Sequence, residues 1–208
     1  MENIDIIRKL ETADDAPSDP YALFGEWFQE ATISEPSDPN AMCLATVNVD
    51  GTPNARMVLM KGYDDGGFVF YTNRESQKGQ ELAQNQHVAL CFHWKTLTRQ
   101  IRVLGTVQEV SSAEADAYYE TRSRGSRIGA WASQQSRPLL SRSALADRVK
   151  ELDAKFGDTD TIPRPPHWTG FRVTPTAIEF WHDGAYRLHT RILYKLNDGV
   201  WQRVMLNP

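Results

Sequence analysis

The chain has 208 residues, of which 40% are hydrophobic and 24% charged, and its formal net charge is −4 at pH 7. These values are typical of one soluble globular domain, and the negative charge excludes a general attraction to nucleic acid or anionic membranes. The sequence shows no signal peptide and no apolar run of roughly 20 residues, so we expect a cytoplasmic protein without a nucleic-acid or membrane partner.

The first predicted element is a helix that begins after Asp19. Residues 1–18 are polar and acidic and are expected to be weakly ordered, ahead of a single domain over residues 19–208. Asp19 is a typical N-cap, and Pro20 suits the first helical position because its ring presets the backbone there. Apolar side chains at spacings of three and four predict an amphipathic helix whose core face carries Phe24, Trp27, Phe28 and Ala31.

Strand patterns follow at near-regular spacing, which favours an antiparallel barrel or sandwich over a parallel sheet. Ser76 is placed to cap a short helix that runs through Leu82. The five strands are expected over residues 41–49, 55–61, 67–72, 88–94 and 99–107.

The C-terminal half combines helices with further strands. Helices are predicted over residues 112–122 and 143–156, the second followed by Gly157 as a C′ residue. We therefore predict a mainly β fold of the α+β class, an antiparallel β-barrel with peripheral helices. Three final strands are expected over residues 169–173, 177–181 and 186–194.

The last of these strands has the most informative pattern. Strand side chains alternate between faces, so Arg187, His189 and Arg191 are predicted to share one face. Two guanidiniums and an imidazole suit an anion, because the guanidinium stays charged and offers a planar donor fork, and an imidazole can titrate near neutral pH. A solvated edge strand explains the same pattern.

Four further groups of polar residues are candidate binding sites, and each has a simpler structural explanation. Arg56 and Lys61 bracket an apolar strand, and Ser76 with Lys78 begins a helix whose free amides suit a phosphate. Tyr118, Arg122 and Ser126 are spaced by four and would share a helix face that suits a second phosphate, or they form a solvated cationic face. Gln135 and Ser136 are uncharged donors.

Several site classes are excluded by their missing signatures. The sequence has no Walker loop, no GxGxxG after a strand and no GxSxG elbow. Its five histidines show no metal-ligand spacing with cysteines or carboxylates, so no metal site is expected.

Eight short motifs occur in a fixed order along the chain. They are residues 38–42, 56–61, 70–73, 99–100, 126–131, 135–136, 170–172, and 178–181 together with 187–189. Taken together, and from about Asp19 to the C-terminus, these motifs resemble the pyridoxine/pyridoxamine 5′-phosphate oxidase family.

The resemblance implies a split-barrel FMN-binding fold and a homodimer with two active sites at the subunit interface. It implies that FMN is held by Arg56, Met57, Val58, Leu59, Met60, Lys61, Tyr71, Thr72, Ser76, Gln77, Lys78, Gln100, Gln135, Ser136, Trp181 and Arg191. It implies that substrate is held by Lys61, Tyr118, Arg122, Ser126, Arg187, Leu188 and His189, with Arg187 and His189 as the catalytic residues.

The implied reaction oxidises pyridoxamine or pyridoxine 5′-phosphate to pyridoxal 5′-phosphate. A hydride leaves the substrate's C4′ for the flavin, and O₂ is then reduced to H₂O₂. Two alternatives remain open: a related split-barrel oxidase of the phenazine-pathway type, and a non-catalytic module that binds flavin or pyridoxal phosphate.

The chain departs from the family's pattern at four places. Residues 1–18 lack the usual basic, tyrosine-containing segment, and Gln77 stands where a basic residue is common. Thr190 replaces an aspartate, and Met205 replaces an arginine.

Overall fold

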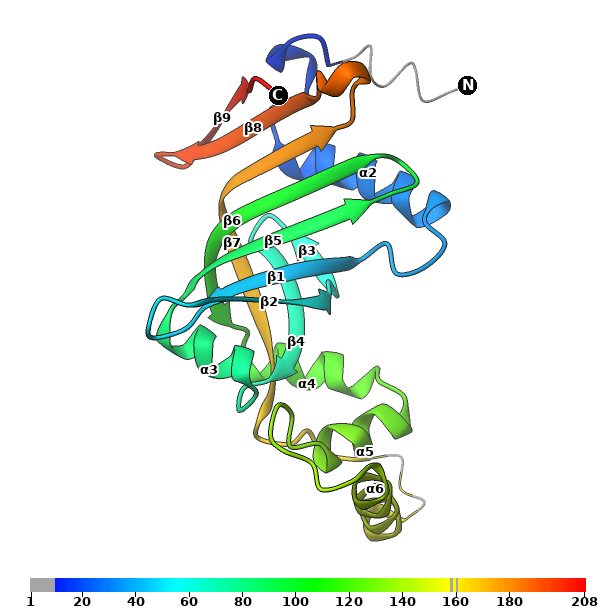
Figure 1. Cartoon of the computed structure of the whole chain (residues 1–208). Helices are drawn as coiled ribbons and strands as arrows, with labels where there is room; N and C mark the ends of the chain where they lie inside the picture. Colours follow the sequence, from blue (N-terminus) through cyan, green and yellow to red (C-terminus); the bar gives the residue numbers. More distant parts are fainter. Residues whose placement is uncertain (1–9, 158, 160) are drawn as a thin grey trace.

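The centre of the molecule is one bent antiparallel sheet (Figure 1). The computed structural model describes residues 10–157, 159 and 161–208. Its strands are β1 (Ala41–Val47), β2 (Pro53–Leu59), β3 (Gly62–Asp64), β4 (Gly67–Asn73), β5 (His87–Trp94), β6 (Arg99–Glu109), β7 (Trp168–His182), β8 (Thr190–Asn197) and β9 (Val200–Met205). They are ordered β2-β1-β5-β6-β7-β4-β3, with β8 and β9 added beside β7.

Strand β7 is the longest and joins the two parts of the sheet. It pairs with β6 along most of its length, with β4 through its first residues and with β8 through its last. The prediction of two separate strands over 169–173 and 177–181 is therefore wrong. At the register shift between Leu104 and Gly105, a Cβ on Gly105 would lie 2.2 Å from the carbonyl oxygen of Thr174. Glycine thus lets the two backbones approach closely, and both strands continue through the bend.

The helices lie around the edges of this sheet. Those over residues 76–82, 112–122 and 143–156 were predicted to within a few residues, whereas α5 was not predicted. Figure 1 shows α4, α5 and α6 gathered at one end of the sheet. None of the described helices is long and apolar enough to cross a membrane. The bounds are η1 (Ala13–Asp15), α2 (Pro20–Ser34), α3 (Gln77–Gln84), α4 (Ser112–Glu120), α5 (Arg124–Ala132), α6 (Arg142–Phe156) and η2 (Ala185–Arg187).

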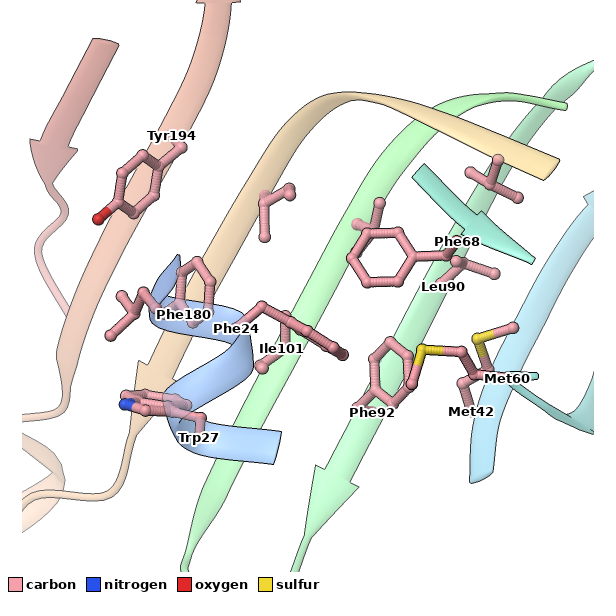
Figure 2. Close-up of a cluster of buried hydrophobic side chains, with 14 of the residues drawn as sticks. Phe24, Trp27, Met42, Met60, Phe68, Leu90, Phe92, Ile101, Phe180 and Tyr194 are labelled. Atoms are coloured by element: carbon pink, nitrogen blue, oxygen red, sulfur yellow. The ribbon is translucent and has the colours of Figure 1, made fainter. Parts of the chain in front are cut away.

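Helix α2 packs its apolar face against the sheet (Figure 2). The Asp19 side chain accepts a hydrogen bond from the Tyr21 amide, and Pro20 opens the helix, as predicted. Phe24 and Ala31 are fully buried and Trp27 is nearly so, which confirms the predicted core face. The Phe24 ring lies 4.9 Å from that of Phe68 and 5.3 Å from that of Phe92, both edge-on.

The N-terminal segment falls partly outside the described residues. Half of the region expected to be weakly ordered, residues 1–9, lies outside the described residues. In the remainder, Leu10 and Ala16 belong to the buried core. The Tyr194 hydroxyl donates to the carbonyl of Pro17 at 2.7 Å, and Arg203 Nε donates to the carbonyl of Ala13 at 2.6 Å.

The predicted strand over residues 186–194 begins late. Its first residues form the turn η2, and β8 begins at Thr190. Tyr186 and Arg187 have φ angles of 58° and 66°, in the left-handed region that a strand never uses. The argument from strand alternation is therefore wrong for Arg187 and His189. The short strand β3 and the C-terminal strand β9 were not predicted.

Replacing Phe24 with alanine should test the role of α2 in the core. We expect F24A to lower the free energy of unfolding by about 3–5 kcal/mol, because the ring is fully buried and a cavity remains. Urea unfolding monitored by circular dichroism measures this loss. The control is I33A on the same helix, where Ile33 is 81% exposed, and a similar loss in both variants would contradict the packing argument.

Candidate functional site

Most of the residues predicted to bind ligands form two groups at opposite ends of the sheet. One group surrounds the helical end, and the other surrounds η2 and the start of β8 (Figure 1). Strand β7 connects them: Trp168 belongs to the first group and Trp181 to the second. Thirteen positions along a strand span roughly 40 Å at about 3.3 Å per residue, although β7 is bent.

The first group surrounds a cavity of about 350 Å³, which we call the Arg122 cavity. It brings together predicted flavin ligands with predicted ligands of the substrate phosphate, from four separate elements. The cavity is lined by Tyr71, Thr72, Asn73, Arg122, Ser126, Gly129, Ala130, Ser133, Gln135 and Trp168.

Stacked aromatic rings form one wall of the Arg122 cavity. The Tyr71 ring lies parallel to Trp168 at 5.1 Å and to Tyr118 at 4.0 Å. A Cβ on Gly170 would lie 2.6 Å from the Tyr71 ring, so glycine is needed for Tyr71 to lie flat on β7. Burial raises the pKa of Tyr71 to about 12, helped by the charge of Glu114, so its hydroxyl stays protonated.

Arg122 is the cation of this cavity. Its guanidinium lies 4.9 Å from the centre of the Trp168 ring, and its buried Nη1 has no hydrogen-bond partner among the described residues. Burial lowers the pKa of Arg122, against the opposing effect of Tyr119. The continuous helix expected to carry Arg122 and Ser126 is wrong, because α4 ends at Glu120 and α5 begins at Arg124. The turn between them still brings both residues to the cavity.

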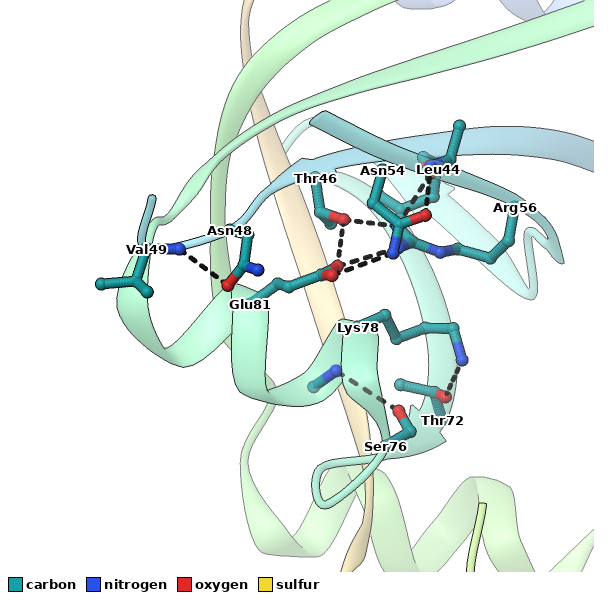
Figure 3. A network of polar contacts seen from close by, with 12 residues as sticks. Leu44, Thr46, Asn48, Val49, Asn54, Arg56, Thr72, Ser76, Lys78 and Glu81 are labelled. Atoms are coloured by element: carbon teal, nitrogen blue, oxygen red, sulfur yellow. Dashed lines mark hydrogen bonds and ion pairs between the residues drawn. The ribbon is translucent and has the colours of Figure 1, made fainter. Parts of the chain in front are cut away.

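Beside the cavity, helix α3 presents a buried lysine (Figure 3). Lys78 is 9% exposed, and among the described residues its Nζ reaches only the Thr72 hydroxyl, at 3.4 Å. Burial lowers the pKa of Lys78 and the nearby Arg56 lowers it further, while Glu81 opposes both. Ser76 caps α3 as predicted: its hydroxyl accepts from the Gly79 amide and donates to the carbonyl of Asn73. These bonds occupy the hydroxyl of Ser76, and the neighbouring Gln77 is exposed.

Arg56 belongs to a buried network that the sequence did not reveal (Figure 3). Its Nη2 lies 2.8 Å from Glu81 Oε2, and Glu81 is only 3% exposed. Thr46 and Asn54 also donate to this carboxylate, at 2.5 and 2.9 Å. Burial alone would raise the pKa of Glu81, but these hydrogen bonds and the charge of Arg56 outweigh it, so the pKa is lowered. The sequence signal that could have indicated this network is the spacing of three between Lys78 and Glu81, which places both side chains on one face of the predicted helix.

The rest of the predicted flavin segment alternates along β2. Met57 and Leu59 are exposed at 63% and 37%, while Val58 packs against the core. Met60 is itself buried in the core, and its amide and carbonyl both bond to Asn40. The exposed Lys61 donates its amide to the carbonyl of Val69.

The second group forms a row across the sheet. Gln100 pairs with Trp181 across β6 and β7, and Trp181 pairs with Arg191 across β7 and β8. Arg191 Nε donates to the buried Glu179 at 2.8 Å, and its Nη1 donates to the carbonyl of Asn207 at 2.9 Å. This carboxylate, which the sequence did not single out, fixes the guanidinium of Arg191.

The predicted catalytic residues lie at the end of this row. The His189 ring packs on Trp181 at 4.6 Å, whereas Arg187 and Leu188 are exposed. The left-handed backbone of Tyr186 and Arg187 costs about 1–3 kcal/mol per residue, a strain that often marks functional sites. Within one chain, the structure does not bring Arg187 or His189 to the Arg122 cavity.

Comparison with known proteins identifies the family. The sequence matches the family model described as pyridoxamine 5′-phosphate oxidase over residues 28–156. It also matches the pyridoxine 5′-phosphate oxidase C-terminal dimerisation region over residues 168–208. The chain belongs to the pyridoxamine 5′-phosphate oxidase family. The resemblance found in the sequence is thereby confirmed, and with it the assignment to an enzyme family.

Curated relatives of this oxidase family cover nearly the whole chain. A pyridoxine/pyridoxamine 5′-phosphate oxidase of Rhizobium etli (strain CIAT 652) is 59% identical over 192 residues, which are 91% of this chain and 93% of the relative. A protein of the same name from Brucella abortus (strain 2308) is 55% identical over 206 residues, 97% of this chain and 99% of the relative.

Solved structures confirm the predicted split-barrel fold. PhzG from Burkholderia lata 383, in complex with tetrahydrophenazine-1-carboxylic acid, aligns with a TM-score of 0.88 and 32% identity over 94% of this chain and 96% of its own. A pyridoxamine 5′-phosphate oxidase-related, FMN binding protein from Nostoc punctiforme aligns with a TM-score of 0.73 and 19% identity, over 91% and 98% respectively, and shows the fold alone.

The Arg56–Glu81 pair should make stability depend on acidic pH. Because the pKa of Glu81 is lowered on folding, its stabilisation is fully present above the unfolded value of about 4.3 and is lost as pH falls through the folded value. E81Q should therefore lower the free energy of unfolding by about 3 kcal/mol at pH 7, with a smaller difference as the medium is acidified. Urea unfolding at a series of pH values measures this, with the exposed E120Q as control. An equal loss at every pH would contradict the assignment.

Proposed function

We propose that this chain oxidises pyridoxamine or pyridoxine 5′-phosphate to pyridoxal 5′-phosphate, with FMN as cofactor and O₂ as the electron acceptor. The observation that carries this proposal is the Arg122 cavity. Its unpaired, buried guanidinium nitrogen requires an anionic partner, because a buried donor without one is costly. A phosphate ester supplies such a partner, and Ser126 adds a hydroxyl beside it.

The residues near Lys78 fit the phosphate of a mononucleotide. A buried ammonium whose one hydrogen bond is 3.4 Å long is poorly satisfied, and Arg56 adds a second positive charge nearby. A dianion bound there would accept hydrogen bonds from Lys78 and compensate its burial. FMN would be held by Arg56, Met57, Val58, Leu59, Met60, Lys61, Tyr71, Thr72, Lys78, Gln100, Gln135, Ser136, Trp181 and Arg191, with Ser76 and Gln77 at the start of the phosphate-binding helix.

The chemistry that FMN would supply when bound is a two-electron oxidation: it would accept a hydride from the substrate's C4′, and O₂ would then take up the two electrons and two protons to become H₂O₂. The protein holds and orients the substrate. Arg122, Ser126, Tyr118 and Lys61 bind its phosphate, while Arg187, Leu188 and His189 cover its pyridine ring. Arg187 is free to do so because no hydrogen bond or ion pair holds its side chain in the described part of the chain.

Two copies of the chain are needed to complete this site. The two groups of ligands lie at opposite ends of one chain, so the second group must come from a partner subunit in a homodimer. The exposed side chains of Met57 and Val204 share one sheet face, since the register aligns Met57, Cys43, Cys91, Arg102, Glu179, Leu193 and Val204. Exposed apolar side chains at both ends of this row, with the Arg102–Glu179 ion pair between them, suit a subunit interface. The match of residues 168–208 to a dimerisation region supports the same arrangement.

A related oxidase acting on a phenazine precursor is the second candidate, favoured by the similarity to PhzG. That ligand, as named for PhzG, is a carboxylic acid rather than a phosphate ester. The Arg122 cavity is lined by both a cation and a hydroxyl, which suits a phosphate better. A non-catalytic flavin-binding module would explain the cavity but not the strained backbone at Arg187.

The proposal is tested with the purified yellow protein. We expect pyridoxine 5′-phosphate to bleach the flavin without oxygen, and to yield pyridoxal 5′-phosphate and peroxide in air. The two products are measured by absorbance and by a peroxidase-coupled assay. Bleaching by tetrahydrophenazine-1-carboxylic acid alone would favour the second candidate. No bleaching by either compound would leave only a binding module.

A complementation experiment tests the shared site. We expect R122A and R187A each to lose most activity, with R187A retaining near-stoichiometric FMN because Arg187 is assigned to the substrate. Mixed dimers place one intact site between the unmutated halves, so random mixing should restore about a quarter of the wild-type activity. Turnover assays on the co-expressed protein, purified without selecting the mixed dimer, measure this. A mixture as inactive as its parents would show that each chain has its own complete site.

A further inference from the structure

The imidazole of His189 lies between two partners of opposite kind. Its Nδ1 is 3.0 Å from Asp183 Oδ1, an acceptor, and 3.2 Å from the amide nitrogen of Gly184, a donor. Nδ1 can donate to the Asp183 carboxylate only when it carries a proton, and it can accept from the Gly184 amide only when it does not. The protonation site of His189 is therefore decided by these two neighbours. In either case Nε2 is left without a hydrogen-bond partner among the described residues.

The carboxylate is the stronger of the two partners. A hydrogen bond to an ionised acceptor is roughly twice as strong as one between neutral groups. The side chain of His189 is 13% exposed, so solvent competes weakly at the ring, although Asp183 itself is 52% exposed. The amide of Gly184 forgoes its bond at modest cost, because Gly184 is only partly buried and water can reach it.

The backbone fixes Asp183 in this place. Its amide donates to the carbonyl of Thr98 at 3.0 Å, which ties the end of β7 to the turn before β6. A Cβ on Gly184 would lie 2.1 Å from the carbonyl oxygen of Leu188, so the loop closes tightly back toward His189. The Trp181 ring then holds the imidazole from its face. Asp183 and Trp181 together orient the imidazole of His189, in the way that the aspartate of a catalytic triad orients its histidine.

We propose that Asp183 is a positioning residue for His189: it keeps the proton on Nδ1 and leaves the lone pair of Nε2 for the substrate's C4′ hydroxyl. The proposal rests on the proposed function. Oxidation of a primary alcohol to an aldehyde releases one hydride and one proton. The hydride leaves with the electron pair of the C4′–H bond to the cofactor, and Nε2 takes the hydroxyl proton.

The protonation site can be read directly by NMR. In holoprotein labelled with ¹⁵N-histidine, the nitrogen shifts of neutral His189 are expected to show the Nδ1–H tautomer, with the signal assigned by its absence in H189Q. In D183A only the Gly184 amide remains beside Nδ1, so we expect the Nε2–H tautomer. D147A removes another exposed aspartate, on α6, and should leave the His189 signal unchanged.

Turnover provides the second measurement. We expect D183A to lower kcat about tenfold or more, with the ~10²–10⁴ that a positioned proton-transfer group contributes as the upper bound. KM for pyridoxine 5′-phosphate and the FMN content should stay near wild type, because the phosphate-binding residues are untouched. D183N keeps an oxygen acceptor and should fall between D183A and wild type, which a purely structural role would not produce.

Two results would overturn the proposal: an unchanged tautomer in D183A, or a kcat of D183A equal to that of D147A. A wild-type protein that forms no pyridoxal 5′-phosphate would instead overturn the proposed function. The NMR comparison would still show where the proton of His189 lies.

Discussion

The continuous pairing of β7 is the constraint on which the rest of the molecule depends. This strand bonds to β6 along most of its length, to β4 at its start and to β8 at its end. Its start contributes Trp168 to the wall of the Arg122 cavity, and its end contributes Trp181 to the platform under His189. Because Trp168 and Trp181 lie at the two ends of one bent strand, the positions of the two groups are fixed relative to each other, and they are far apart within one chain.

Charge pairing distinguishes two kinds of cation among the residues proposed to bind ligands. Arg56 and Arg191 each face a buried carboxylate, Glu81 or Glu179, which fixes the guanidinium and balances its positive charge. Arg122 instead has an unpaired buried nitrogen, and Lys78 has one long hydrogen bond. Buried charges are stable only when they are compensated, so the second pair suits the phosphates proposed to bind there.

Local signals in the sequence identified most elements. The capping by Asp19 and Ser76 and the spacing of Phe24, Trp27 and Ala31 are interactions between near neighbours, and the structure confirms them. The order of the motifs identified the family. Prediction failed where distant contacts decide the backbone, as in the continuous β7 and the left-handed turn before β8.

By itself, the sequence determined the class of fold, the family and the residues with the right chemistry for phosphate and flavin. The tertiary structure alone decided which side chains these residues contact: Arg122 contacts Trp168, Arg56 contacts Glu81, and His189 contacts Asp183. The physical reason is that hydrogen-bond partners and burial depend on groups far apart in the chain. Asp183 and His189 are only a few residues apart in the sequence, yet their contact also depends on a distant residue. The loop that joins them is anchored by a hydrogen bond from the Asp183 amide to the carbonyl of Thr98, in the turn before β6.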